Sequence, residues 1–214
     1  MKLYFTKTPK IVKWIYPKRI WSFNESENTI FLSFDDGPIP EVTPWVLEQL
    51  RIYNAKATFF CIGDNVQKHP TIFETIIAEG HTIGNHTFNH LNGWKTKANK
   101  YLENCILYEN SEFITQNSKL FRPPFGKLTS KQSDLLQKKG YKIIMWDVLS
   151  ADFDTSVSEE KCLQNVLKNT KKGSIVVFHD SLKAKTNLYF TLPKVLAYFT
   201  KKGFEFKCIP SLNQ

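Results

Sequence analysis

The chain has 214 residues, of which 42% are hydrophobic and 17 are phenylalanine, which provides for a sizeable core and argues against global disorder. The net charge of +9 favours acidic partners, but the lysines are spread along the chain as solvated helix faces, so we expect no nucleic acid partner. No apolar run reaches transmembrane length and no signal-peptide pattern begins the chain, which predicts a cytoplasmic protein.

Residues 1–28 form a predicted N-terminal extension, followed by one domain at 29–214. The extension mixes apolar and basic residues, namely Trp14, Ile15, Tyr16, Ile20 and Trp21 with Lys10, Lys13, Lys18 and Arg19. We expect it to pack on the domain, and peripheral contact with an anionic membrane is the alternative. The cysteines form no CxxC pair and are predicted to be reduced and mostly buried: Cys61, Cys105, Cys162 and Cys208. Nothing in the sequence sets an oligomeric state.

From residue 29 onward, strand-like apolar runs alternate with helical patterns. Strands are predicted at 29–34, 57–62, 119–122, 142–146, 174–178 and 204–208, with a weaker one at 81–83. Helices are predicted at 43–50, 71–79, 99–113, 130–140, 156–171 and 190–202, with N-cap residues Thr43, Ser130 and Ser156. This alternation predicts an α/β fold in which crossover helices connect the strands of a parallel sheet.

Two adjacent acids stand at the end of the first strand, in Ser33-Phe34-Asp35-Asp36-Gly37-Pro38. Neighbouring side chains on a strand point to opposite faces, so both acids can share one site only where the backbone bends. Gly37 and Pro38 provide such a bend. Functional groups of a barrel gather at the carboxyl ends of its strands, which is where these acids lie.

His86 and His90 follow the weak strand with a spacing of four residues. On a helical turn this spacing places both imidazoles on one face, as in helix-borne zinc sites. Asp36 is the best-placed third ligand, and such a set leaves positions open for water and substrate. Non-haem iron oxygenases use the same ligand types and stay open as an alternative, although the additional acid and histidine suit hydrolysis better.

Three further segments carry candidate residues at strand ends. Arg122 precedes two prolines, so the first free amide of that turn belongs to Phe125, which suits an oxyanion site. His179 follows the apolar run at 175–178. Near the end of another strand, the pairs Trp146-Asp147 and Asp152-Phe153 each offer an acid that can hold an arginine, orient a histidine or cap a loop.

Together these segments resemble the polysaccharide deacetylase family, the NodB homology domain of carbohydrate esterase family four. Five motifs match in order across residues 30–180, and they are Phe34-Asp35-Asp36-Gly37, His86-Thr87-Phe88-Asn89-His90, Arg122-Pro123-Pro124-Phe125, Asp152-Phe153 and Val177-Phe178-His179. The resemblance implies a distorted (β/α) barrel of about seven parallel strands with outer helices.

The resemblance also implies roles for these residues. A divalent metal, usually zinc, with cobalt or another divalent ion as alternatives, would be bound by Asp36, His86 and His90. Asp35 would be the general base and His179 the general acid. Arg122 would hold Asp35, Asp152 would orient the catalytic pair, and the backbone of Phe125 would stabilise the oxyanion.

The implied activity is hydrolysis of N-acetyl groups on an amino sugar, oligosaccharide or polysaccharide, with release of acetate. Phe153 stands where the family usually has Trp and Val177 where it usually has Leu, and with Trp146 they are predicted to line the substrate pocket. Both changes keep an apolar wall, so they concern substrate fit. A non-sugar amide, an O-acetyl ester and an inactive carbohydrate-binding relative are the alternatives.

Overall fold

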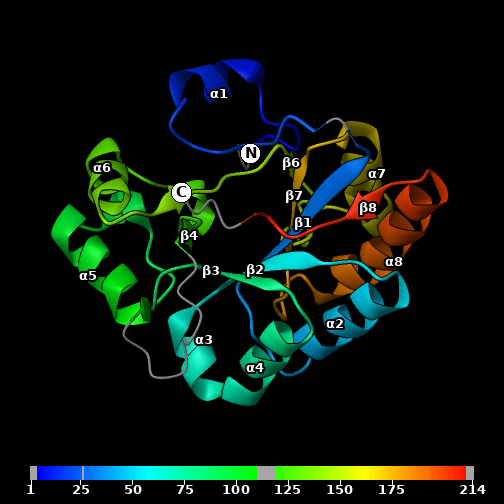
Figure 1. The fold of residues 1–214 in the computed structure, drawn as a ribbon, viewed down its shortest axis with the longest axis horizontal. Coiled ribbons are helices and arrows are strands. Elements are labelled where there is room, and N and C mark those ends of the chain that lie inside the picture. Colours follow the sequence, from blue (N-terminus) through cyan, green and yellow to red (C-terminus); the bar gives the residue numbers. More distant parts are fainter. Residues whose placement is uncertain (1–3, 26, 110–118, 211–214) are drawn as a thin grey trace.

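The computed structural model describes residues 4–25, 27–109 and 119–210, and within them seven parallel strands form one curled sheet. The sheet order is β5-β4-β3-β2-β1-β7-β6, and β8 pairs with β1. The strands are β1 (Thr29–Asp35), β2 (Ala57–Cys61), β3 (Thr82–Asn85), β4 (Leu120–Phe121), β5 (Lys142–Ile143), β6 (Val148–Leu149), β7 (Ile175–His179) and β8 (Glu205–Phe206). The helices surround the sheet (Figure 1), which confirms the predicted distorted barrel.

The helices broadly follow the prediction. They are α1 (Lys10–Ile15), α2 (Thr43–Ile52), α3 (Gly63–Lys68), α4 (Pro70–Ala78), α5 (Ala98–Glu109), α6 (Ser130–Lys138), α7 (Glu159–Asn169) and α8 (Lys185–Lys201), with short 3-10 helices η1 (Gly93–Lys95) and η2 (Pro124–Gly126). Helix α3 and strand β6 were not predicted, and α8 begins at Lys185 rather than at residue 190. The predicted helical residues 110–113 lie outside the described residues.

The predicted N-caps were wrong by one or two residues. The caps are Val42, Thr129 and Ser158 in place of Thr43, Ser130 and Ser156. Thr43 and Ser130 are the first residues of their helices rather than the caps, and Ser156 lies before its helix. Ser156 donates its hydroxyl to Asp154 Oδ1 at 2.7 Å.

Strand β1 lies at the centre of the core and all seven of its residues are buried. Strands of a parallel sheet are covered on both faces, so they are apolar nearly throughout. The ring of Phe34 stacks on Phe59 of β2 and Phe178 of β7, with centroids 5.1 and 6.1 Å apart. This packing fixes the carboxyl ends of three neighbouring strands relative to one another.

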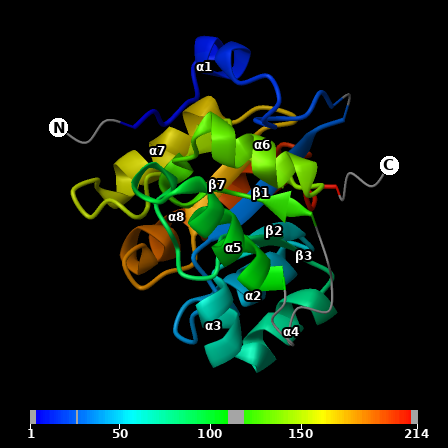
Figure 2. The same ribbon diagram turned by 90° about the vertical axis from the view of Figure 1, so that its left-hand side faces the viewer.

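The N-terminal segment lies along the two free edges of the sheet, as Figures 1 and 2 show. We call residues 4–9 the strap. It runs antiparallel to β6, with a bridge between Lys7 and Val148 and a hydrogen bond from Leu149 N to Thr6 O of 2.9 Å. After α1, Ile20 bridges to Ile144 just beyond β5. Backbone groups at a sheet edge that would otherwise be unpaired are thereby satisfied.

The strap is fixed by a buried carboxylate. Asp147 accepts hydrogen bonds from Lys7 and Lys13, each at 2.6 Å, through its two oxygens. Thr8 adds a backbone bond to Asp147 O of 2.9 Å and a hydroxyl bond to Trp146 O of 2.7 Å. Of the three uses we expected for Asp147, holding an arginine is the nearest, but the cations that it pairs with are two lysines of the N-terminal segment.

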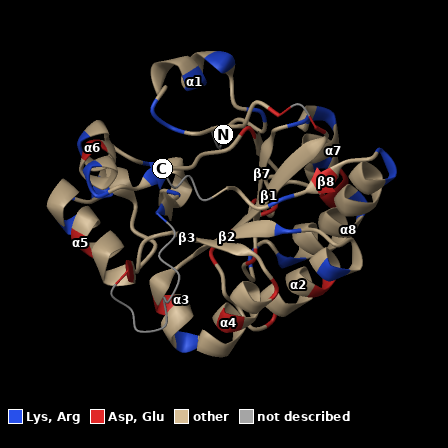
Figure 3. Cartoon of the chain, in the orientation of Figure 1, with Lys and Arg blue, Asp and Glu red and all other residues tan. Residues whose placement is uncertain are grey.

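Lysine and arginine residues are distributed over the outer helices, with acidic residues among them (Figure 3). The four cysteines are free; three are buried and Cys208 is partly buried, which agrees with the prediction. Among the described residues no helix is both long and apolar enough to cross a membrane.

Candidate active site

A cavity of about 590 Å³ opens at the carboxyl ends of the strands. It is lined by all of the predicted metal ligands and by most of the predicted catalytic and pocket residues: Asp35, Asp36, His86, His90, Phe125, Trp146, Phe153, Val177 and His179. Tyr4, Gly126, Lys127, Leu149, Ser181 and Lys183 complete the lining. The two remaining predicted residues, Arg122 and Asp152, are fully buried and contact members of the lining.

Asp36, His86 and His90 form the candidate metal centre, and one ligand atom from each lies within 4.8 Å of the others. Asp36 Oδ1 is 3.2 Å from His90 Nε2 and 3.7 Å from His86 Nε2. The backbone of Asp36 has φ 85°, so the chain bends at this residue and both acids reach the same cavity. A carboxylate with two imidazoles is a donor set that suits a divalent transition metal.

The protonation of the cluster fits metal binding. Burial lowers the pKa of His86 to about 4, so its ring is neutral at pH 7. The ring Nδ1 lies 2.8 Å from Arg122 O, and a carbonyl can only accept, so Nδ1 carries the proton and Nε2 offers a lone pair. Burial alone would raise the pKa of Asp36, but the His90 hydrogen bond and the histidine charges outweigh it and hold that pKa below its usual range.

The segment from His86 to His90 is a loop, and no helical turn forms there. Thr87 and His90 have φ values of 63° and 53°, which a right-handed helix does not allow. Side chains stabilise the loop instead: Asn85 Oδ1 accepts from Thr87 N at 2.8 Å, and Thr87 Oγ1 accepts from Leu91 N at 3.0 Å. The two imidazoles therefore converge through loop geometry rather than through the spacing of a helical turn.

Asp35 is held by a fully buried arginine. Arg122 Nη1 donates to Asp35 Oδ1 at 2.6 Å and to Ser33 Oγ at 2.8 Å. Its Nη2 donates to Met145 O at 3.1 Å, and its guanidinium lies 4.1 Å from the centroid of the Phe60 ring. Burial lowers the pKa of Arg122, and the charge of Asp35 opposes that shift. The guanidinium is thus fixed on several sides and holds the carboxylate in one orientation.

His179 lies beside Asp35, because the two residues are register partners on the adjacent strands β7 and β1. Asp152 accepts from the backbone N–H of His179 at 2.7 Å and lies 2.8 Å from its ring Nδ1. Burial alone would lower the pKa of His179, but the Asp152 carboxylate raises it to about 9. Asp152 thus orients the histidine and keeps it protonated at neutral pH.

The turn at residues 123–126 lies beside the metal centre. Gly126 N and Lys127 N bond within the turn, to Pro123 O and Pro124 O at 3.0 and 3.1 Å. Phe125 has φ 60° and its ring centroid is 4.6 Å from that of His90. A Cβ atom on Gly126 would approach Trp146 to 2.6 Å, so glycine allows the tryptophan to pack against the turn.

Two residues of this region were not predicted from the sequence. Asp180 is buried and accepts from Gly37 N at 3.0 Å and from Thr43 Oγ1 at 2.6 Å, and burial raises its pKa to about 8. A Cβ atom on Gly37 would lie 2.0 Å from Asp180 Oδ2, so glycine makes this approach possible. Asp180 therefore braces the bend after Asp36, and its position directly after His179 was the available signal. The other missed residue is Tyr4, which the strap places in the cavity wall.

Comparison with known proteins agrees with this geometry. The model of the family described as polysaccharide deacetylase matches residues 23–144. The chain belongs to the polysaccharide deacetylase family. A relative from Bacillus cereus named peptidoglycan-N-acetylglucosamine deacetylase is 37% identical over 196 residues, covering 90% of this chain and 91% of the relative.

Two further relatives extend the comparison within the family. A chitooligosaccharide deacetylase from Azorhizobium caulinodans is 34% identical, with 73% of this chain and 75% of the relative covered. The crystal structure of a peptidoglycan N-acetylglucosamine deacetylase in complex with 4-naphthalen-1-yl-N-oxidanyl-benzamide superposes with a TM-score of 0.87 and 32% identity, covering 96% of each chain. The similarity to this structure thus extends over nearly the whole chain.

Proposed function

We propose that this polysaccharide deacetylase hydrolyses the N-acetyl amide of amino sugars in an oligosaccharide or polysaccharide and releases acetate. The observation that carries the proposal is the cavity itself, in which the Asp36, His86 and His90 cluster lies with Asp35 and His179. One acid is held by a buried arginine and one histidine by a buried aspartate. Amide hydrolysis needs such a base for water and such an acid for the leaving amine.

We propose zinc as the metal of the Asp36, His86 and His90 cluster. Two imidazoles and one carboxylate match the ligand set of catalytic zinc sites, which leave a position open. Zinc bound there would polarise the acetamido carbonyl and promote ionisation of the attacking water. The buried contact between His86 and Arg122 O supports this assignment, because it leaves Nε2 free to bind.

Each remaining residue has a proposed role in the proton transfers. Asp35 takes a proton from the attacking water while Arg122 keeps its carboxylate oriented. The N–H of Phe125 donates to the oxyanion that forms on the former carbonyl oxygen. His179, protonated and held by Asp152, then donates its proton to the amine nitrogen as the C–N bond breaks. The products are acetate and a free amino sugar.

The pocket residues and the relatives guide the choice of substrate. Trp146, Phe153 and Val177 give the cavity an apolar wall, which suits an acetyl methyl group and the face of a sugar ring. The relatives are named for peptidoglycan and chitooligosaccharide, so both glycan types are candidate substrates.

The test is an acetate-release screen over chitooligosaccharides, peptidoglycan fragments, a non-sugar acetamide and an O-acetyl ester, with metal analysis of the same sample. The proposal expects acetate from at least one N-acetylated glycan, together with bound zinc. Iron with oxygen consumption would support the oxygenase alternative. Binding of glycans without any acetate release would support an inactive relative and contradict the proposed function.

We also propose that α1 contacts an anionic membrane surface. Ile11, Trp14 and Ile15 are 58%, 75% and 53% exposed and share one helix face by their spacing, with Lys10 nearby. Co-sedimentation with vesicles containing anionic lipid tests this idea. Trp14→Ser should weaken binding, whereas Trp94→Ser, at an exposed tryptophan on η1, should not. Equal binding of both variants would contradict the proposal.

A further inference from the structure

The wall of the cavity nearest His179 is built in part by the strap. Tyr4 lines the cavity together with Leu149, Phe153 and Val177. Its ring centroid is 5.5 Å from that of Phe153, whose ring in turn is 4.9 Å from the imidazole of His179. A continuous row of three rings therefore leads from the N-terminal segment to the proposed general acid.

The direction of the strap explains why Tyr4 reaches the site. Parallel strands of this barrel bring their carboxyl ends to the cavity, and the strap pairs antiparallel with β6. Its earlier residues therefore lie toward the carboxyl end of β6, which is the side of the active site. Leu149 links the two, because its N–H donates to Thr6 O at 2.9 Å while its side chain lines the cavity.

Tyr4 is held at two points, through the hydroxyl of its side chain and through the strap that carries it. Its hydroxyl donates to Asp154 Oδ2 at 3.0 Å, and Asp154 is only 2% exposed and also accepts from Ser156. Three residues further on, Lys7 is paired with buried Asp147. A ring held in this way acts as a firm wall, whereas a free terminal side chain would move aside for a larger ligand.

We propose that Tyr4 limits the size of the acyl group that the deacetylase accepts, so that the strap is part of the substrate site and favours acetyl over longer chains. This inference rests on the proposed function. The apolar surfaces of Leu149, Phe153 and Val177 suit the alkyl part of an acyl group, and Tyr4 closes the same side of the cavity. An apolar pocket of defined size discriminates by about 10-fold to 200-fold for each additional methylene.

The test compares Tyr4→Ala with the wild type on tetramers of glucosamine that carry N-acetyl, N-propionyl or N-butyryl groups. The ratio of kcat/KM for butyryl to that for acetyl should rise about ten-fold or more in Tyr4→Ala. It should rise by less in Tyr4→Phe, which keeps the ring and loses the bond to Asp154 that holds it. Tyr4→Trp, which enlarges the ring, should lower the ratio.

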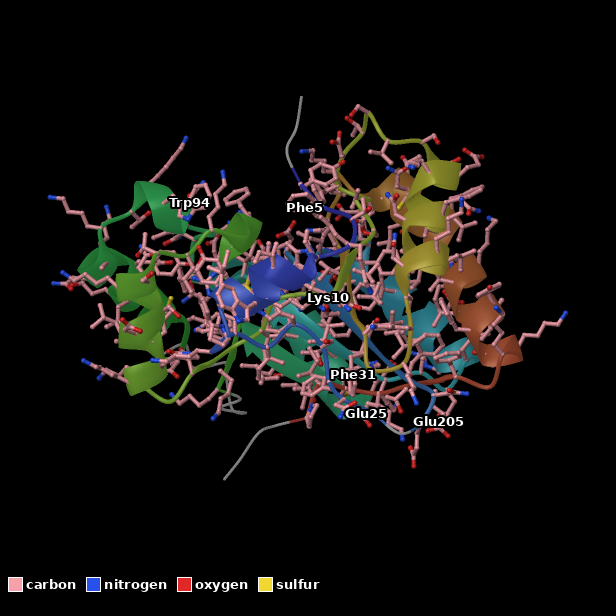
Figure 4. All side chains as sticks on the ribbon, turned by 90° about the horizontal axis from the view of Figure 1, so that it is seen from above. Phe5, Lys10, Glu25, Phe31, Trp94 and Glu205 are labelled. Carbon is pink, nitrogen blue, oxygen red and sulfur yellow. The ribbon has the colours of Figure 1, made fainter. Side chains whose placement is uncertain are left out.

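Phe5→Ala is the matched control, because Phe5 is the neighbouring aromatic residue and is 61% exposed. Phe5 is labelled in Figure 4, and it is not among the residues that line the cavity. Its ratio should equal that of the wild type. A merely structural role of Tyr4 would lower the rates on all three tetramers together and leave the ratio unchanged, and that result would overturn the inference.

Binding of acetohydroxamate and butyrohydroxamate to the protein as purified gives a second readout that needs no turnover. Tyr4→Ala should bind butyrohydroxamate more tightly relative to acetohydroxamate by a similar factor. If the wild type releases no acetate from any tetramer, the proposed function fails, and the hydroxamate ratio still decides whether Tyr4 sets the size of the pocket. An unchanged hydroxamate ratio in Tyr4→Ala contradicts the inference in either case.

Discussion

Asp35 and Asp147 are both buried aspartates, 3% and 0% exposed, and each has a cation 2.6 Å away, yet they lie in different surroundings. Asp147 has both oxygens occupied, by Lys13 on Oδ1 and by Lys7 on Oδ2, and it joins the strap to the barrel. Asp35 bonds Arg122 through Oδ1 and lines the cavity. Burial and ion pairing alone therefore do not identify a catalytic acid; what distinguishes Asp35 is the space that it faces.

The largest expected effect is on catalysis by Asp35→Asn. Removal of the general base should lower kcat by about 10²-fold to 10⁴-fold, because water would then have no positioned group to accept its proton. Asp147→Asn is the matched control. Its kcat should stay close to that of the wild type, because Asp147 does not line the cavity. Steady-state acetate release measures both. An equal loss of kcat in the two variants would show that burial and pairing, rather than position in the cavity, determine the effect.

The next effect concerns the pH dependence set by His179. The folded-state pKa of about 9 means that the histidine is protonated at neutral pH and loses its proton as the pH rises through 9, so kcat should fall on that side. The ion pair between His179 and Asp152 contributes its full stabilisation of the fold below pH 6.5, the ordinary pKa of histidine. This contribution is lost as the pH rises through about 9.

Asp152→Asn removes the charge that raises the pKa of His179 and should move the alkaline limb of the rate profile to lower pH. A profile of kcat from about pH 6 to about pH 10 for both proteins checks this expectation, because that range includes both the ordinary pKa of histidine, 6.5, and the raised pKa of His179, about 9. An unmoved limb in Asp152→Asn would assign the alkaline limb to a different group.

The smallest effect is on stability and concerns Asp147 itself. Asp147→Asn should lower the free energy of unfolding by about 2 kcal/mol, less than the typical loss for a fully buried pair, because Lys7 and Lys13 are 34% and 25% exposed. Asp64→Asn breaks an exposed ion pair with Lys68 and should change the free energy of unfolding by less than about 0.5 kcal/mol. Urea unfolding measures both changes. Equal values would mean that the anchor of the strap contributes no more than a surface ion pair.

Local patterns in the sequence predicted the parts of the site that lie at strand ends. Asp35 and His179 each follow a buried apolar run, and the alternation of strands and helices was enough to place them at one edge of a parallel sheet. The roles of the acids and histidines depended on the family resemblance, because the same ligand types also occur in oxygenases.

The parts that could not be predicted depend on contacts between distant segments. Strand β6 has only two residues, and its pairing with the strap joins residues about 140 apart, as in the Lys7 bond to Asp147. Tyr4 reaches the cavity only through that pairing, so no local signal marks it. The course of the loop carrying His86 and His90 could not be predicted, because hydrogen bonds to the side chains of Asn85 and Thr87, rather than backbone periodicity, shape it.

The central claim is that the adjacent acids have separate roles, with Asp36 binding the metal and Asp35 acting on water. The most direct test measures zinc per chain by elemental analysis, together with acetate release, in the wild type, Asp36→Asn and Asp35→Asn. We expect Asp36→Asn to lose zinc and activity together, and Asp35→Asn to lose activity while keeping the zinc content of the wild type. Loss of zinc in Asp35→Asn, or full zinc content in Asp36→Asn, would contradict this claim.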